Sequence, residues 1–287
     1  MPTIPRRVGE MLTEGLKQFQ PIIAGAKTRD VNEADTVVIA TDVLAGVFGY
    51  DKYNEITREY AIRGTSCDLA IKLDEQPRIL IEVKAVGLDL KEMHVKQAVD
   101  YAANKGIEWT VLTNSARWKV YRVTFAKPID QELILDIDLL SLNPKTQAHI
   151  DLLYPLSRDG LMKSALLEYH TQRQAMSKFS LAALLLSEPM LKTIRRELRR
   201  FSPGVNIETD DIKTALMEDV LKREVVEGEK AEEARRRLQR LLRKQLRASQ
   251  PKIDGETQEL VEDQEESPEE SSETVTSENL VDDEAKE

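Results

Sequence analysis

The segment Arg78–Lys84 constrains the fold of this chain more than any other feature. Its run Ile79-Leu80-Ile81 is typical of a strand that is buried on both faces of a sheet. Two segments before it, Glu55–Ile62 and Cys67–Leu73, alternate between apolar and polar residues, as strands do. The turn-forming sequence Asp74-Glu75-Gln76-Pro77 separates the second of these from Arg78–Lys84. We therefore expect strands that pair through this turn.

Helical patterns and two further strands surround this group. Apolar residues recur at helical spacing over residues 6–20, 32–48 and 90–104, with Asn32 as a plausible N-cap. Strands are expected at Trp109–Thr113 and Trp118–Val123. The order α-α-β-β-β-α-β-β predicts one α/β domain over residues 1–138, with a mixed central sheet flanked by helices.

The second half of the chain has a different character. We expect residues 139–159 to be a linker and residues 160–250 to form a mostly helical region. Residues 251–287 are rich in Glu, Ser, Asp and Thr and contain no aromatic residue, so they cannot bury enough apolar surface to offset their chain entropy. We expect this tail to be disordered. The helices of the second half are expected at 161–174, 178–187, 189–200, 210–226 and 229–248.

Charge is unevenly distributed along the chain. The net charge of −10 argues against a nucleic-acid partner. However, residues 251–287 hold fifteen acidic residues and two lysines, a net charge of −13, whereas residues 1–250 carry 39 basic and 36 acidic residues, a net charge of +3. Such an asymmetry points toward binding of a polyanion or its control.

Two helical segments contain clusters of lysine and arginine residues. Residues 235–247 contain no acid, and Leu238, Leu242 and Leu246 form a stripe, so this segment predicts a basic amphipathic helix. We expect it to bind nucleic acid, because like charges at helical spacing repel without an anionic partner. A solvated face, a membrane-surface helix and a partner-binding helix are the alternatives. The expected nucleic-acid-binding residues are Arg235, Arg236, Arg237, Arg240, Arg243, Lys244 and Arg247; a second basic cluster comprises Lys192, Arg195, Arg196, Arg199 and Arg200.

The acidic tail directly follows this basic helix. We hypothesise that the tail folds back on the bases and competes with nucleic acid. A solubilising tail without specific contacts is the alternative.

Several classes of protein are excluded by composition. No apolar run reaches the roughly 18–20 residues that a transmembrane helix needs, and residues 1–9 contain no apolar segment of a secretory signal. The single cysteine, Cys67, excludes an internal disulfide framework and a cysteine-rich zinc site. We expect a cytoplasmic protein without a membrane partner.

Polar residues at the ends of two expected strands are candidates for chemistry. Asp68 lies at the start of one strand, and Glu82 and Lys84 share a face at the end of the next. Pairing through the turn brings Asp68 to the same end of the sheet. Two carboxylates and the Val83 backbone carbonyl then form an oxygen site suited to Mg²⁺ or Mn²⁺, as in phosphodiester hydrolysis. A same-face ion pair without catalytic use is the alternative.

Two helices add further candidates. Glu33 lies in line with the apolar positions Val37 and Leu44, where a carboxylate is costly unless it is paired, although it also suits an exposed helix start. Gln97 and Tyr101 lie four residues apart, on the face opposite Val95, Val99 and Ala102, and can contact the site or form a surface hydrogen bond.

Together these segments resemble the PD-(D/E)XK nuclease superfamily, and more closely the N-terminal nuclease domain of type I restriction enzyme R subunits. The resemblance covers roughly residues 25–125. It rests on Asn32-Glu33-Ala34-Asp35-Thr36, Gly64-Thr65-Ser66-Cys67-Asp68-Leu69-Ala70-Ile71, Leu80-Ile81-Glu82-Val83-Lys84-Ala85, Gln97 with Tyr101, and Leu112-Thr113-Asn114 with Trp118.

The resemblance implies a restriction-endonuclease-like fold and a role for each candidate. Asp68 and Glu82 would bind the divalent metal, and Lys84 would assist the attacking water. Glu33 would be the helix-borne acid, and Gln97 and Tyr101 the accessory pair. Cys67 stands where the superfamily pattern has proline.

The chain lacks the phosphate-binding loop of an ATP-driven motor. It is therefore not a complete R subunit by itself, and it is either a stand-alone nuclease or a domain reused for another task. A motor or assembly subunit supplied in trans is a candidate partner. We expect a Mg²⁺-dependent DNA endonuclease, with defence against foreign DNA as its candidate role. A non-catalytic nucleic-acid-binding or regulatory module on a nuclease fold, and a partner-assembly protein, are the alternatives.

Overall fold

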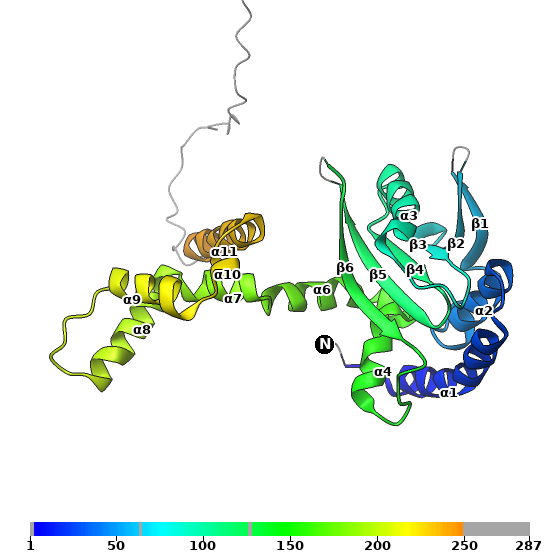
Figure 1. The fold of residues 1–287 in the computed structure, drawn as a ribbon, viewed down its shortest axis with the longest axis horizontal. Coiled ribbons are helices and arrows are strands. Elements are labelled where there is room, and N and C mark those ends of the chain that lie inside the picture. Colours follow the sequence, from blue (N-terminus) through cyan, green and yellow to red (C-terminus); the bar gives the residue numbers. More distant parts are fainter. Residues whose placement is uncertain (1–2, 63–64, 126–127, 249–287) are drawn as a thin grey trace, which may run out of the picture. The chain divides into compact units, whose positions relative to one another are not determined.

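The computed structural model describes residues 3–62, 65–125 and 128–248 (Figure 1). In these residues six strands form one mixed sheet whose spatial order is the chain order. Strands β3 and β4 are parallel and joined through helix α3 (Glu92–Lys105), whereas all other neighbours are antiparallel. This confirms the expected mixed α/β sheet. The strands are β1 (Ile56–Ile62), β2 (Thr65–Leu73), β3 (Gln76–Val83), β4 (Trp109–Thr113), β5 (Arg117–Thr124) and β6 (Asp130–Asp138).

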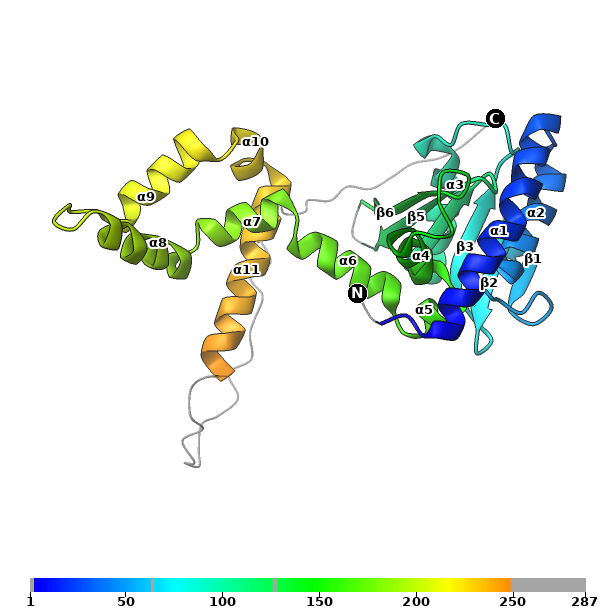
Figure 2. The ribbon, with the colours of Figure 1, turned by 90° about the horizontal axis from the view of Figure 1, so that it is seen from below.

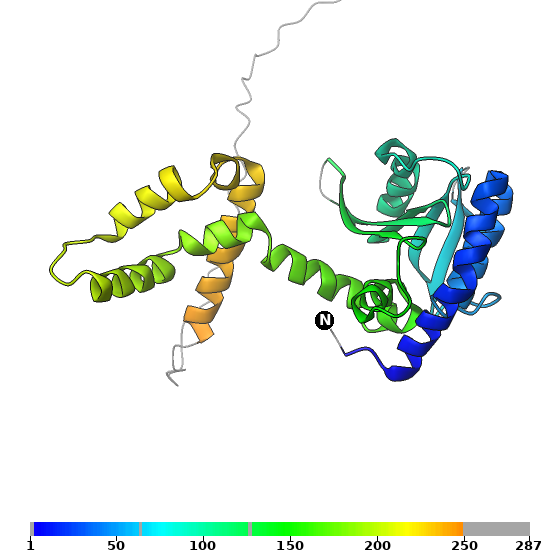
Figure 3. The same ribbon diagram turned by 60° about the horizontal axis from the view of Figure 1, so that its bottom comes forward.

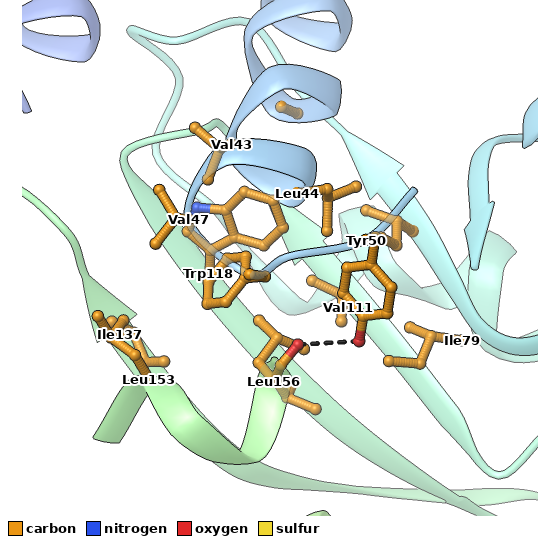
Figure 4. Close-up of a cluster of buried hydrophobic side chains, with 14 of the residues drawn as sticks. Val43, Leu44, Val47, Tyr50, Ile79, Val111, Trp118, Ile137, Leu153 and Leu156 are labelled. Carbon is orange, nitrogen blue, oxygen red and sulfur yellow. Dashed lines mark hydrogen bonds between the residues drawn. The ribbon is translucent and has the colours of Figure 1, made fainter. Parts of the chain in front are cut away.

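Helices cover both faces of the sheet (Figure 2). Helices α1 (Arg6–Arg29) and α2 (Glu33–Gly46) pack on one face, and α3 packs on the other. Ile79 and Ile81 of β3 contribute to the first core and Leu80 to the second, so β3 is buried on both faces as the sequence predicts. The Trp118 ring meets Phe48 edge to face at 5.3 Å, inside the first core (Figure 4).

The first helix is longer than expected, because it continues through Pro21 to Arg29. Proline inside a helix removes one backbone hydrogen bond and costs about 3 kcal/mol. Buried Phe19 and Ile23 lie on either side of Pro21. Their packing stabilises the helix across the proline. Gln20 further ties this part of α1 to the segment after β6, since its Nε2 donates to the carbonyl oxygens of Leu139 and Leu142 at 2.7 Å each.

The turn between β2 and β3 is tighter than the expected four residues. Asp74 and Glu75 both have positive φ, at 53° and 60°, as the two central residues of a type I′ hairpin turn do. Gln76 and Pro77 already belong to β3. The hairpin itself is as predicted.

Strand β6 was not predicted, and the segment expected to be a linker carries core residues. Residues 139–159 contain α4 (Gln147–Leu153), a 3-10 turn at Tyr154–Leu156 and the start of α5 (Arg158–Met162). Leu153, Tyr154 and Leu156 are fully buried in the first core. The Tyr50 hydroxyl donates to the Leu156 carbonyl at 2.9 Å (Figure 4).

The described residues after Leu156 are mostly helical, as expected (Figure 3). The expected single helix 210–226 is interrupted, because Leu221 is extended after a π-helical turn at Leu216–Val220. By internal contacts the chain divides into residues 1–238 and 239–287. The tail at 251–287 lies outside the described residues. The helices are α6 (Ala165–Ala175), α7 (Lys178–Leu185), α8 (Glu188–Phe201), α9 (Thr209–Ala215), α10 (Arg223–Val226) and α11 (Glu229–Ala248).

Helix α6 is fastened to the outer strands of the sheet by polar contacts. The buried His170 ring lies between Arg122 of β5, at 3.2 Å, and Glu132 of β6, at 3.0 Å. Arg173 donates to the carbonyl of Ile134. No helix in the described part of the chain is both long and apolar enough to cross a membrane.

Candidate functional site

Asp68 and Glu82 lie where the pairing of β2 and β3 ends. Leu69 and Ile81 are the last paired residues of this ladder. Beyond them the Val83 N–H donates to Oδ2 of Asp68 at 2.7 Å. The acceptor is thus a carboxylate side chain and not a backbone carbonyl of β2. Lys84 N–H instead donates to the carbonyl of Thr113 on β4, at 2.8 Å. The strands therefore hold the Asp68 carboxylate against the backbone of β3.

Lys84 joins the carboxylates of a strand and a helix. Its Nζ donates to Oε1 of Glu82 at 2.6 Å and lies 3.5 Å from Oε1 of Glu33. Glu33 is the first residue of α2, where Asn32 caps the helix by accepting the N–H of Asp35 at 2.9 Å. The Glu33 side chain is 49 % exposed, whereas that of Glu82 is 8 % exposed. Glu33 thus has both an exposed helix start and a charged partner.

Burial shapes the electrostatics of this cluster. Burial raises the pKa of both Asp68 and Glu82. The hydrogen bond from the Val83 N–H lowers the pKa of Asp68, and Lys84 lowers that of Glu82, but neither cancels the effect of burial. Burial by itself would lower the pKa of Lys84, but the hydrogen bond and charge of Glu82, with the charges of Glu33 and Asp68, outweigh it and raise that pKa. Lys84 is therefore held as an ammonium among carboxylates that gain from a nearby cation.

The donor set can be compared with what Mg²⁺ requires. Oδ1 of Asp68 and Oε2 of Glu82 accept no hydrogen bond in the described part of the chain. Within the same residues no three His, Cys, Asp or Glu side chains are grouped as a metal site would need. Mg²⁺ commonly binds through one or two carboxylates and retains several waters. The buried Glu82 carboxylate and the partly buried Asp68 carboxylate, beside the Val83 backbone, fit that requirement.

Gln97 and Tyr101 lie in different surroundings on α3, and their role as an accessory pair stays a prediction. Tyr101 is 5 % exposed and packs in the second core with Val95, Val99 and Ala102, so its expected position opposite these residues was wrong. Gln97 is exposed on α3. In the described residues neither side chain shares a hydrogen bond with the carboxylates or Lys84, and the buried Tyr101 hydroxyl has no hydrogen-bond partner.

Sequence reasoning missed Glu59, which lies beside Asp68. Glu59 has the positive φ of 48° within β1, between the residues paired with Leu69 and Cys67. Its charge contributes to the raised pKa of Asp68. The alternating pattern of β1 does not mark Glu59 as a site residue. Its approach to Asp68 depends on the register in which β1 pairs with β2, which the sequence does not show.

Sequence reasoning also missed the roles of three buried polar residues behind the site. Thr36, Asn114 and Ser115 are 0 %, 9 % and 0 % exposed. The sequence motifs include Thr36 and Asn114, but nothing in their spacing indicates that they meet each other or Ser115. They connect the start of α2 to the chain that follows Lys84.

Cys67 has the structural role that its surroundings favour. Its thiol is fully buried and donates to the Ile81 carbonyl at 3.0 Å. Burial, with the charges of Glu82 and Asp68, raises its pKa to about 12.

The two basic clusters differ in their partners. On α8 every base has an acidic partner, and the ion pairs are Lys192–Glu188, Arg195–Glu208, Arg196–Glu197, Arg199–Glu208 and Arg200–Glu197. On α11, Arg237, Arg240 and Arg243 are exposed and form no ion pair in the part of the chain that is described. Arg235 donates to the Val226 carbonyl, and Arg236 pairs with Glu232 at 3.5 Å. The side chains of Lys244 and Arg247 lie outside the described residues.

A family model matches part of the chain. Residues 32–136 match the family model of the type I restriction enzyme R protein N terminus. The matched residues include Glu33, Asp68, Glu82 and Lys84. Comparisons with curated proteins and with solved structures gave no match. Over residues 32–136 this chain therefore resembles the N-terminal domain of type I restriction enzyme R subunits, a family whose description indicates a restriction-related nuclease function.

Proposed function

We propose that this protein is a Mg²⁺-dependent DNA endonuclease that acts in restriction of foreign DNA. The observation that supports this best is the convergence of Lys84 with Glu82 and Glu33, beside an Asp68 carboxylate held by Val83. The family match of residues 32–136 favours a nuclease over an unrelated use of the same side chains.

Each residue has a role that follows from its surroundings. Asp68, Glu82 and the Val83 carbonyl would hold the cation. When bound, the cation would activate water and offset the charge of the phosphate. Lys84, held as an ammonium by its carboxylate neighbours, donates hydrogen bonds and so orients the water or a phosphate oxygen rather than removing a proton. Glu33 holds the Lys84 ammonium from the helix side.

Plasmid cleavage tests this proposal. We expect nicking or cleavage with Mg²⁺ that EDTA abolishes, and a loss of at least about 100-fold for Asp68→Ala, Glu82→Ala and Lys84→Ala, in the range usual for such groups. Lys52→Ala is the matched control, because Lys52 also pairs with an acid, Asp42 at 2.5 Å, but at an exposed position. Activity that survives the three site substitutions would refute the assignment.

A second candidate is a DNA-binding module that does not use the site. The unpaired arginines of α11 favour it, since they can bind phosphates whether or not cleavage follows. Mn²⁺ titration separates the two, because a catalytic chain binds Mn²⁺ and loses it on Asp68→Asn. DNA is the proposed partner in both cases, and a motor subunit supplied in trans is proposed only for the nuclease.

A further inference from the structure

Thr36, Asn114 and Ser115 form a buried polar hub behind Glu33 and Lys84. The Thr36 hydroxyl accepts the N–H of Val86 at 3.1 Å and donates to the carbonyl of Asn32 at 2.7 Å. Thr36 is three residues after Glu33, on the same side of α2, and Val86 is two residues after Lys84. The Thr36–Val86 hydrogen bond therefore runs beside the Glu33–Lys84 ion pair.

The turn between β4 and β5 completes the hub. Asn114 Nδ2 donates to the carbonyls of Val86 and Leu88 at 3.2 and 3.0 Å, and the Ser115 hydroxyl donates to the carbonyl of Thr36 at 3.1 Å. One turn thus binds both the chain after Lys84 and the first turn of α2. Together with the Glu33–Lys84 ion pair, these hydrogen bonds link helix α2 to the chain segment that follows β3.

We propose that Thr36 and Ser115 are positioning residues that set the approach of Glu33 to Lys84. This inference rests on the proposed function, because it assigns the hub to the same site. Thr36 and Ser115 are fully buried and hydrogen bonded, so their geometry is well defined, whereas the Glu33 side chain is half exposed and depends on its helix for its place.

Cross-linking measures this positioning without requiring activity. A carbodiimide joins an amine to a carboxylate only when the two are in contact, and Lys84 contacts both Glu33 and Glu82. The ratio of the Glu33–Lys84 product to the Glu82–Lys84 product, measured by mass spectrometry of the full chain, reports where α2 lies. We expect Thr36→Val to lower this ratio about five-fold, because it removes the hydrogen bond that joins α2 to Val86, and Ser115→Ala to lower it in the same direction.

Two variants control for loss of fold. Thr36→Ser keeps the hydroxyl and should restore the native ratio. Thr41→Val removes another buried hydroxyl of α2, one that donates only to Val37 within the same helix, and should leave the ratio unchanged. An unchanged ratio in Thr36→Val, or an equal fall in Thr41→Val, would overturn the inference.

Cleavage kinetics then connect the hub to the reaction. We expect Thr36→Val to lower kcat about five-fold with little change in KM, and to have no further effect when Glu33 is already replaced by Gln. Additive losses would show that Thr36 acts through something other than Glu33. Absence of cleavage by the native chain would refute the proposed function, while the cross-link ratio would still decide the positioning of Glu33.

Discussion

Asp68 and Glu82 carry charge where burial disfavours it. The Val83 N–H and the Lys84 ammonium only partly compensate them, and the pKa of both carboxyl groups stays raised. Buried carboxylates with raised pKa values do not stabilise a fold, whereas they help a site to attract a cation. The cost therefore supports a functional reason for these residues.

Asp68→Asn should make the protein more stable at pH 8. Because the pKa of Asp68 is raised in the folded state, the folded protein binds this proton more tightly than the unfolded chain, and stability falls as pH rises through the folded-state pKa. Asparagine has no such proton and still accepts the Val83 N–H. Urea denaturation at pH 5 and pH 8 should show a gain in the free energy of unfolding that is larger at pH 8. Asp42→Asn, at an exposed position, should show no such gain, and a variant less stable than native at pH 8 would contradict the argument.

Residues differ in how far the sequence reveals them. The placement of Asp68, Glu82 and Lys84 at one end of two paired strands could be predicted, because strand alternation and one hairpin turn are local patterns. The hub was not found, because Val86 lies 50 residues from Thr36 and Ser115 lies 79 residues from it. Tyr101 was misplaced because helical spacing fixes which residues share a face but not where the buried sector ends.

Helices α1 and α2 cross at a contact that only glycine permits. A Cβ added at Gly15 would lie 2.4 Å from the carbonyl oxygen of Gly46 and 2.7 Å from Cα of Val47. This contact fixes the approach of α2 to α1, and hence the place of the helix that carries Glu33. The sequence predicted both helices but not their crossing, nor the continuation through Pro21, since both depend on packing rather than on local pattern.

Gly15→Ala should therefore destabilise the protein although it places a better helix former in a helix. The overlap with backbone atoms should lower the free energy of unfolding by about 2 kcal/mol. Gly25→Ala is the matched control in the same helix, where the added Cβ meets only the Arg29 side chain at 3.6 Å. Helix propensity predicts a gain of up to about 1 kcal/mol there. Thermal and urea unfolding measure both, and equal effects would exclude the close helix crossing as the cause.

At the scale of the whole molecule, the net charge of a helix does not show whether its lysines and arginines form ion pairs. Both α8 and α11 are basic in sequence, but each base of α8 pairs with one of three acids, Glu188, Glu197 and Glu208. Helix α11 instead leaves three arginines unpaired in the described residues. The competing role of the acidic tail stays a prediction, because residues 251–287 lie outside the described part.

Charge reversal on α11 should weaken DNA binding more than the same change on α8. We expect the triple substitution Arg237→Glu, Arg240→Glu and Arg243→Glu to lower affinity and to reduce the slope of log affinity against log salt by about 3, at roughly 0.9 per phosphate contact. The control triple Lys192→Glu, Arg196→Glu and Arg200→Glu should change the slope by less than about 1. Fluorescence anisotropy over a salt series measures both, and equal slopes for the two triples would rule out α11 as the preferred surface.

The strand order of the sheet has a consequence for folding during synthesis. Each strand pairs with the strand before it in the chain, so the sheet can grow in the direction in which the ribosome delivers it, at a small cost in loop entropy. The first core, however, is closed by Tyr154, Leu156 and Leu166. All four charged groups of the site can therefore be delivered, and the strands beneath them paired, before the residues that seal the interior have left the ribosome.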